Sequence, residues 1–110
     1  MSSALTVKDS SDVVVSIKAD LRHLCPHVEE IDYGTVEITW RVDGSTYELH
    51  SLAEYLRGFK DSEISHEQIT DRIRHDLSVN EGIELVSVET TWGTAGMEVR
   101  CSTSVAEVSA

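Results

Sequence analysis

Cys25, Asp32 and the adjacent pair His66 and Glu67 are the residues of this chain whose types and spacing suit chemistry. A cysteine becomes a nucleophile when its thiol pKa falls, or when a neighbouring acid or base manages its proton. Cys25 precedes Pro26 in a polar stretch, which is an unusual place for a cysteine that only fills a core. Asp32 follows seven residues later and could donate a proton. These residues predict a thiol-dependent enzyme.

Glu67 allows two interpretations, because it falls in the first turn of a predicted helix. Unpaired backbone N–H groups there favour a negative side chain, so Glu67 could simply compensate the helix dipole. It could also accept hydrogen bonds from the N–H donors of a guanine-like base. Asp32 is similarly open to two interpretations, a loop carboxylate or a general acid beside Cys25. Spacing alone leaves both residues undecided.

A zinc site is the competing interpretation of the same region. Cys25, His27 and Cys101, with or without His66, would supply three or four ligands. The chain has no CxxC spacing to support such a site, so we expect no metal. Cys101 lies in an alternating apolar segment and is expected to pack as a small hydrophobe. The other histidines lack a distinguishing partner in sequence or fall on a charged helix face: His23, His50 and His75.

Length and composition indicate one acidic domain. The chain has 110 residues, 40% of them hydrophobic, and a net charge of -11. This charge excludes broad, non-specific phosphate binding, which needs clustered Lys and Arg. No apolar run approaches the roughly 20 residues of a membrane span, and no leader is recognised. We therefore expect a cytoplasmic protein without membrane contact, with both cysteines reduced.

The hydrophobic pattern predicts the first half of the fold. Residues 1–11 are Ser-rich and polar and predict a flexible tail, followed by a single domain over residues 12–110. Residues 13–17 predict a strand that continues irregularly towards Leu24. Residues 36–42 alternate in polarity and predict a second strand that ends at a turn over residues 43–44.

Two helices and two more strands follow. Capping boxes predict helix starts at Ser51 and Ser65, and Gly58 and residues 80–82 predict the ends. Strands are expected over residues 83–92 and 97–108, joined by residues 93–96. The order ββααββ predicts an α+β domain with an antiparallel sheet and both helices on one face.

Several motifs with ungapped spacing carry a family resemblance over about residues 13–108. They are Leu24-Cys25-Pro26, Asp32-Tyr33-Gly34-Thr35-Val36, Glu48-Leu49-His50-Ser51-Leu52, Tyr55-Leu56 and His66-Glu67. The chain thereby resembles the 7-cyano-7-deazaguanine (preQ0) nitrile reductases, the QueF family. The resemblance implies the tunnelling fold (T-fold), which the GTP cyclohydrolases share. It also implies assembly into pentameric rings, often stacked into decamers, with pockets between protomers.

The resemblance also implies residue roles. Cys25 would add to the nitrile carbon and form a covalent thioimide, while Asp32 would transfer the proton. The positions implied to contact substrate are His66, Glu67, Glu48 and Leu49. These roles suit a nitrile, which becomes electrophilic towards a thiolate once its nitrogen is protonated.

Departures from the reductase pattern point to a different second reactant. His50 and Ala53 stand where the reductases carry two lysines that help to hold NADPH. Residues 92–97 replace an Arg-Gly-Gly segment, and no GxGxxG loop compensates. The chain therefore resembles the QueF-like amidinotransferases, in which ammonia attacks the thioimide and produces the formamidine of archaeosine. We expect no cofactor, an NADPH site that is lost, and ammonia as co-substrate.

Two alternatives remain open at this point: an NADPH-dependent preQ0 reductase and a non-catalytic module that binds deazapurines. The substrate would be a deazaguanine in tRNA, in DNA or as a free base. The open sheet edges of a small ββααββ unit favour self-association.

Overall fold

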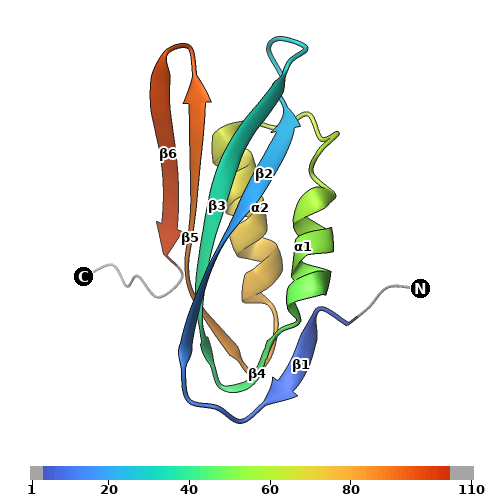
Figure 1. The fold of residues 1–110 in the computed structure, drawn as a ribbon, viewed down its shortest axis with the longest axis vertical. Coiled ribbons are helices and arrows are strands. Elements are labelled where there is room, and N and C mark those ends of the chain that lie inside the picture. Colours follow the sequence, from blue (N-terminus) through green and yellow to red (C-terminus); the bar gives the residue numbers. More distant parts are fainter. Residues whose placement is uncertain (1–3, 105–110) are drawn as a thin grey trace.

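Two helices pack on one face of a four-stranded antiparallel sheet (Figure 1). The computed structural model describes residues 4–104. The strand order in the sheet is β2-β3-β5-β6, and the long connection from β3 to β5 carries both helices. The elements are β2 (Val14–Leu24), β3 (Ile31–Val42), α1 (Leu49–Arg57), α2 (His66–Ser78), β5 (Ile83–Thr94) and β6 (Met97–Ser104). The predicted α+β class is confirmed, and the ββααββ order holds for the four-stranded sheet and the two helices.

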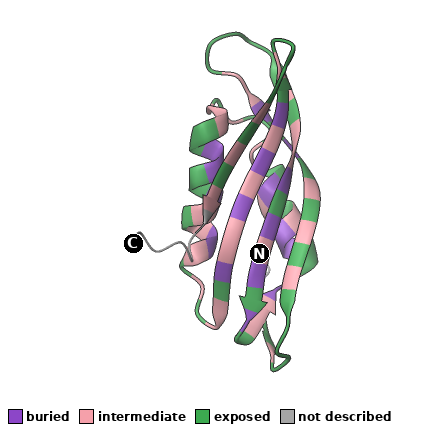
Figure 2. Ribbon diagram, turned by 90° about the vertical axis from the view of Figure 1, so that its left-hand side faces the viewer, coloured by how far each residue is buried: buried purple, intermediate pink, exposed green. Residues whose placement is uncertain are grey.

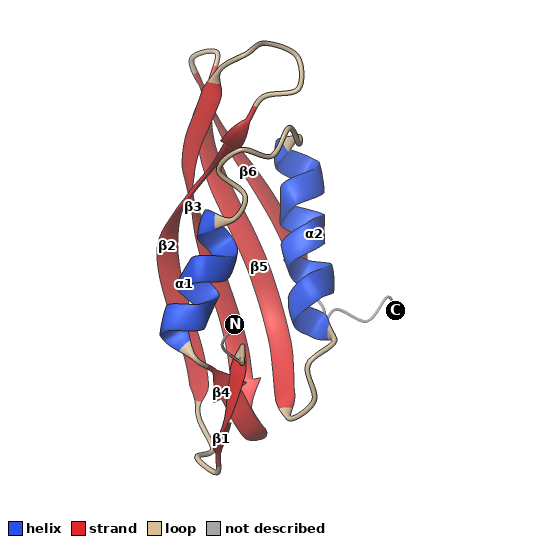
Figure 3. Ribbon diagram, turned by 90° about the vertical axis from the view of Figure 1, so that its right-hand side faces the viewer, coloured by secondary structure: helices blue, strands red, loops and turns tan. Residues whose placement is uncertain are grey.

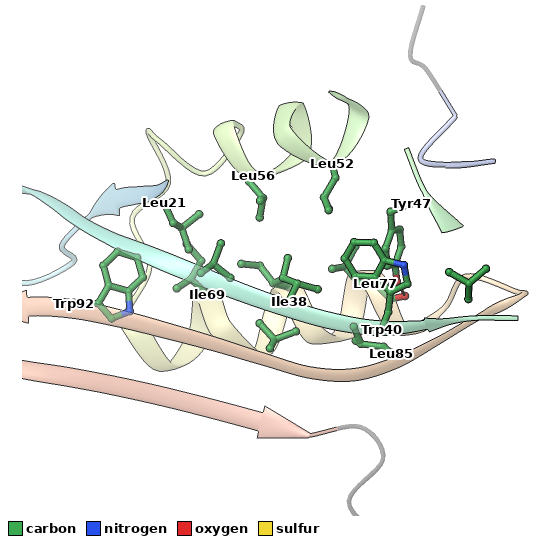
Figure 4. Packing of buried hydrophobic residues seen from close by; sticks show 14 residues of the cluster. Leu21, Ile38, Trp40, Tyr47, Leu52, Leu56, Ile69, Leu77, Leu85 and Trp92 are labelled. Atoms are coloured by element: carbon green, nitrogen blue, oxygen red, sulfur yellow. Dashed lines mark hydrogen bonds between the residues drawn. The ribbon is translucent and has the colours of Figure 1, made fainter. Parts of the chain in front are cut away.

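The core lies between the sheet and the helices, and the other face of the sheet faces outward (Figure 3). Buried and less buried residues alternate along the strands, as expected for a sheet covered on one face (Figure 2). Figure 4 shows the packed layer, whose largest members are Trp40, Trp92 and Tyr47. The Tyr47 hydroxyl donates to the Leu77 carbonyl of α2 at 2.7 Å, and burial raises the pKa of Tyr47 to about 12. No helix within residues 4–104 is long and apolar enough to cross a membrane.

The N-terminal segment differs from the predicted tail. Residues Thr6–Asp9 form β1, which pairs antiparallel with β4 (Gly44–Tyr47) in a separate two-stranded sheet. Neither short strand has an apolar pattern that would predict it from sequence. Each is a strand only because it pairs with the other, which lies far away in the sequence. The expected looseness of residues 1–11 is therefore wrong for residues 6–9. Residues 1–3 lie outside the described part.

The helix starts show one correct and one wrong prediction. Ser65 caps α2 through a complete capping box with Gln68, as expected. In contrast, α1 begins at Leu49 with Glu48 as its N-cap, and Ser51 lies inside the helix. The Glu48 carboxylate accepts hydrogen bonds from the backbone N–H groups of His50 and Ser51, each at 3.0 Å. Glu48, the residue before the helix, thus accepts from the two N–H groups with its carboxylate. It takes the capping role that the sequence had assigned to Ser51.

The strands are longer and more regular than predicted. β2 keeps an unbroken register with β3 up to Leu24, so the expected irregularity is absent from this pair. β3 begins at Ile31, which places Asp32 in a strand rather than in a loop. The β5–β6 turn is shorter than expected, with Ala95 and Gly96 at positive φ. The predicted end of the last strand, at residue 108, lies outside the described residues.

Candidate active site

Three side chains from three elements meet at one end of the sheet. His23 comes from β2, Asp32 from β3 and His66 from the first turn of α2. Asp32 Oδ2 lies 3.3 Å from His66 Nε2 and 3.7 Å from His23 Nε2. The first distance fits a weak hydrogen bond from the imidazole N–H, while the second is too long for one. We refer to these three residues as the His–Asp–His cluster.

Backbone pairing explains why residues so far apart in sequence meet here. His23 and Asp32 are directly opposite each other in the β2–β3 register. Both backbone groups of Leu24 bind the connection between the helices. The Leu24 N–H donates to the Ser62 carbonyl, and the Leu24 carbonyl accepts from the Ile64 N–H. That connection leads into the N-cap of α2. The two hydrogen bonds of Leu24, the backbone clamp, therefore place the first turn of α2 beside the end of β2.

His23 is completely buried, and one of its ring nitrogens has no partner. Its Nδ1 lies 3.1 Å from the Leu24 carbonyl, a contact that requires the proton on Nδ1. Its Nε2 then carries a lone pair that faces the cluster without a hydrogen bond. Burial lowers the pKa of His23, because a charged imidazolium is costly away from water.

Trp92 holds the two histidine rings. The indole stacks on His66 with centroids 4.6 Å apart and meets His23 edge-on at 4.7 Å. A directed chain of hydrogen bonds joins Trp92 to the same helix turn. Trp92 Nε1 donates to Thr90 Oγ1 at 2.9 Å, and Thr90 and Thr70 hydroxyls meet at 2.6 Å. Thr70 in turn donates to the His66 carbonyl at 2.7 Å, so Thr90 must donate to Thr70.

Cys25 begins the loop that joins the strands of His23 and Asp32. Its backbone N–H donates to the Glu30 carbonyl at 2.9 Å and closes this six-residue loop over residues 25–30. The thiol is free and half-buried. Cys25 therefore lies at the same end of the sheet as the His–Asp–His cluster.

The other predicted site residues lie elsewhere on this chain. Glu67 is exposed and lines a hollow of about 430 Å³ between α2 and β6, together with Cys101. Glu48 and Leu49 open α1, whose other end borders β2 near Leu21. Leu49 and Arg57, at the two ends of α1, are eight residues apart, which corresponds to about 12 Å of helix. Asp32 and His66 are thus in contact, whereas within residues 4–104 no side-chain hydrogen bond or ion pair joins Glu67, Glu48 or Leu49 to either of them.

The side chains that could share a metal ion are not those expected. Within residues 4–104, the one group of three potential ligands is His23, Asp32 and His66, whose ligand atoms lie within 4.8 Å of one another. The zinc set of Cys25, His27 and Cys101 is not brought together. Cys101 pairs with Thr90 midway along the edge strand β6, whereas Cys25 lies beyond the end of β2.

Sequence reasoning missed His23, Thr70, Thr90 and Trp92. Trp92 was recognised only as the end of a strand, and His23 only as a histidine without a partner. The available signal was the alternation in β2, which places His23 on the same face as Leu21 and thus towards the core. A histidine on a buried strand face needs polar partners, and sequence spacing does not identify them.

The fold is that of an α+β protein, with a carboxylate and two imidazoles grouped at one end of an antiparallel sheet and a cysteine in the loop at that end. The family model described as QueF-like protein matches residues 31–107. The chain belongs to the QueF-like protein family.

Named relatives agree with this family. An NADPH-dependent 7-cyano-7-deazaguanine reductase of Prochlorococcus marinus is 42% identical over 59 residues, 54% of this chain and 43% of the relative. A reductase of the same name from Rhodopirellula baltica is 37% identical over 73 residues, 66% of this chain and 60% of the relative. The chain thus spans less than two thirds of the length of these two relatives.

A solved structure has the same fold. The archaeosine synthase QueF-Like in its apo form matches with a TM-score of 0.78 and 18% identity, over 90% of this chain and 99% of that one. This match confirms the expected fold.

Proposed function

We propose that this protein is an amidinotransferase that converts the nitrile of 7-cyano-7-deazaguanine to a formamidine through a thioimide on Cys25. The observation that carries the proposal is the placement of Cys25 directly after β2, at the end of the sheet where His66 contacts the Asp32 carboxylate at 3.3 Å. Nitrile activation needs a nucleophile and a proton donor on the same C≡N group, and both lie at this end of the sheet.

The proposed reaction has two stages. The Cys25 thiol gives its proton to the Asp32 carboxylate, the sulfur forms a bond to the nitrile carbon, and Asp32 passes that proton to the nitrile nitrogen, which yields the thioimide. Ammonia then adds to that carbon and forms a tetrahedral adduct, in which a proton moves from the added nitrogen to the former nitrile nitrogen. The C–S bond breaks to give a thiolate and a protonated formamidine, and one proton returns from the formamidine to the thiolate. No oxidation or reduction occurs, so the reaction needs no redox cofactor.

The choice of ammonia over hydride is supported by α1 and by the β5–β6 hairpin. His50 and Ala53 occupy the α1 positions at which the resemblance places lysines for NADPH, and the His50 side chain is 98% exposed. The hairpin turns through Ala95 and Gly96 and carries no arginine between residues 92 and 97. A dinucleotide would lack several charge-assisted hydrogen bonds at these positions.

A second candidate is an NADPH-dependent reductase, because the named relatives carry that activity in their names. Both candidates share the thioimide and differ only in the second reactant, hydride or ammonia. Their products, an aminomethyl group and a formamidine, differ in mass and in nitrogen count.

A nucleic-acid substrate is supported by a local basic hollow on an otherwise acidic chain. Arg22, Arg57 and Lys60 line a hollow of about 470 Å³ together with Tyr33 and one acidic residue, Asp20. Tyr33 is 63% exposed. Within residues 4–104 none of these three cations forms a salt bridge, whereas Arg41, Arg72 and Arg74 do. Unpaired cations and an exposed ring suit phosphates and a stacked base.

Self-association is the remaining part of the proposal. β2 and β6 are the edge strands of the four-stranded sheet, and edge strands need cover. Glu48, Leu49 and Glu67 lie apart from the His–Asp–His cluster within one chain. In the pentameric or decameric ring that the family resemblance implies, they would line the pockets between protomers.

Intact-mass spectrometry after incubation with preQ0 tests the covalent step. We expect an adduct on the wild type and on Cys101→Ala, and none on Cys25→Ala. The absence of an adduct on folded wild type would contradict both enzymes and leave a binding module. ¹⁵N-ammonium or NADPH is then supplied with free preQ0, preQ0-containing tRNA or preQ0-containing DNA. Incorporation of ¹⁵N supports the amidinotransferase, and NADPH consumption with an aminomethyl product would contradict it.

A further inference from the structure

We propose that the His–Asp–His cluster binds one transition-metal ion of the zinc type, through His23 Nε2, His66 Nε2 and an oxygen of Asp32. The three ligand atoms lie within 4.8 Å of one another. In a tetrahedral zinc site with bonds of 2.0–2.2 Å, neighbouring ligand atoms are about 3.3–3.5 Å apart. The distances to Asp32 Oδ2, 3.3 Å and 3.7 Å, need only small adjustments to reach that geometry.

The unpartnered nitrogen of His23 is the second, independent observation. His23 is 0% exposed, and its Nε2 has no hydrogen bond within the described residues. A buried acceptor without a partner carries a cost of about 1–3 kcal/mol, which a ligand at this point would relieve. His23 Nε2 and the Asp32 carboxylate both present lone pairs. His66 presents a third when its proton is on Nδ1, and a single cation accepts all three.

The remaining contacts of His23 are those of a metal ligand. Its Nδ1 is tied to the Leu24 carbonyl at 3.1 Å, which keeps the Nε2 lone pair directed at the cluster. Histidines that bind metals usually donate their other N–H to a carbonyl or carboxylate in this way. Trp92 holds both imidazoles, edge-on to His23 and stacked on His66. Two of the three ligands therefore have restricted orientations before any ion binds.

The ligand set defines the class of ion. Two imidazoles and one carboxylate suit Zn²⁺, Co²⁺ and Ni²⁺, whereas Mg²⁺ and Ca²⁺ prefer all-oxygen sites. A metal ion occupies the Asp32 oxygen that would otherwise carry the proton for the nitrile. Metal binding and the proposed catalysis therefore exclude each other, and zinc acts as an inhibitor. Only this last consequence depends on the proposed function.

Cobalt titration of the purified, metal-stripped full chain tests the site without any turnover assay. We expect the visible d–d bands of four-coordinate Co²⁺, saturating at one ion per chain and displaced by Zn²⁺. His23→Gln, His66→Gln and Asp32→Asn should each weaken Zn²⁺ binding in calorimetry by more than the roughly 10–100-fold that loss of an outer partner costs. His75→Gln and His27→Gln, which alter exposed histidines, should bind as the wild type does.

Folding and thiol binding are controlled in the same experiment. Circular dichroism shows whether each variant is folded, and three separate variants guard against the failure of one. Absence of d–d bands in folded wild type overturns the proposal, as does unchanged affinity in folded His23→Gln. A thiolate-to-cobalt charge-transfer band that survives His23→Gln also overturns it, because the cysteines would then hold the ion. The preQ0 adduct assay is run with a chelator, so its result stands independently of the metal site.

Discussion

The imidazole of His66 lies flat against the indole of Trp92, with 4.6 Å between ring centroids and 3° between ring planes. His66 opens α2 and Trp92 lies near the end of β5, so this contact joins the helix to the sheet at the candidate site. The stacked ring directs its Nε2 towards Asp32 at 3.3 Å. The geometry of the proposed proton donor thus depends on what holds Trp92.

The hydrogen bonds that run from Trp92 through Thr90 to Thr70, the threonine chain, are expected to contribute to the free energy of unfolding. Thr90→Val keeps the side-chain volume but leaves the Trp92 N–H and the Thr70 hydroxyl without Thr90 Oγ1. Buried polar groups that lose a partner cost about 1–3 kcal/mol, so urea denaturation should show a loss of this size. The preQ0 adduct should also form more slowly, because His66 loses support from the same network.

Thr91→Val is the control for this change. Thr91 is the next residue on β5 and lies on the outer face, where it borders Lys18 and Glu89. We expect its effect on the free energy of unfolding to stay within about 0.5 kcal/mol. Equal effects of the two substitutions would show that the threonine chain contributes nothing specific.

Gly34 provides the space that Trp92 occupies. A Cβ at this position would meet the Thr91 carbonyl oxygen and two carbons of the Trp92 indole at 2.5 and 2.8 Å. Gly34→Ala is therefore expected to displace Trp92 and to destabilise the protein by about 1–3 kcal/mol, the usual cost of overpacking. Gly93→Ala is the matched control, since a Cβ there meets no atom within 4 Å. Thermal unfolding that ranks the two variants in the opposite order would contradict this account.

Glu48 is expected to make stability depend on acid pH. Hydrogen bonds from the backbone N–H of His50 and from the Ser51 hydroxyl favour the carboxylate and lower the pKa of Glu48 to about 2, from an ordinary value of 4.5. The folded state therefore holds the proton less tightly than the unfolded state. The stabilisation is complete above pH 4.5 and is lost as the pH falls towards about 2.

Thermal unfolding of Glu48→Gln followed across this pH range tests that dependence. Near neutral pH the variant should unfold at a lower temperature than the wild type, and the gap should close as the pH approaches about 2. Glu54→Gln, an exposed change on the same helix, should show no such closing gap. A gap that stays constant with pH would mean that the capping carboxylate is not the titrating group.

The basic hollow should affect nucleic-acid binding through charge. Arg57→Glu and Lys60→Glu are each expected to weaken binding of a preQ0-containing tRNA in fluorescence anisotropy. The slope of log K against log salt should fall by about 1 for each phosphate that the variant no longer binds. Lys18→Glu makes the same charge change on the outer face of the sheet and is the control. If it weakens binding as much, the effect comes from net charge and not from the hollow.

Local sequence patterns predicted most of the fold, because their physical causes are local. The capping box of Ser65 and Gln68 closes within one turn, and the alternation around Ile38 and Trp40 reflects burial on one face of a strand. The N-cap of α1 was misplaced, because Ser51 and Glu54 match a capping box whereas the actual N-cap, Glu48, is not a residue type that N-cap preferences predict. β1 and β4 were missed because each exists only through its distant partner.

The sequence by itself determined the family and the α+β fold, and it predicted a thiol and a carboxylate suited to nitrile chemistry. Only the tertiary structure decided which groups surround that carboxylate. His23 reaches Asp32 through strand register, and His66 reaches it through the backbone clamp at Leu24. The unpartnered nitrogen of His23 follows from these two contacts, because its surroundings come from three elements far apart in sequence. Burial and hydrogen-bond partners of this kind depend on how elements pack, and residue spacing along one chain does not encode them.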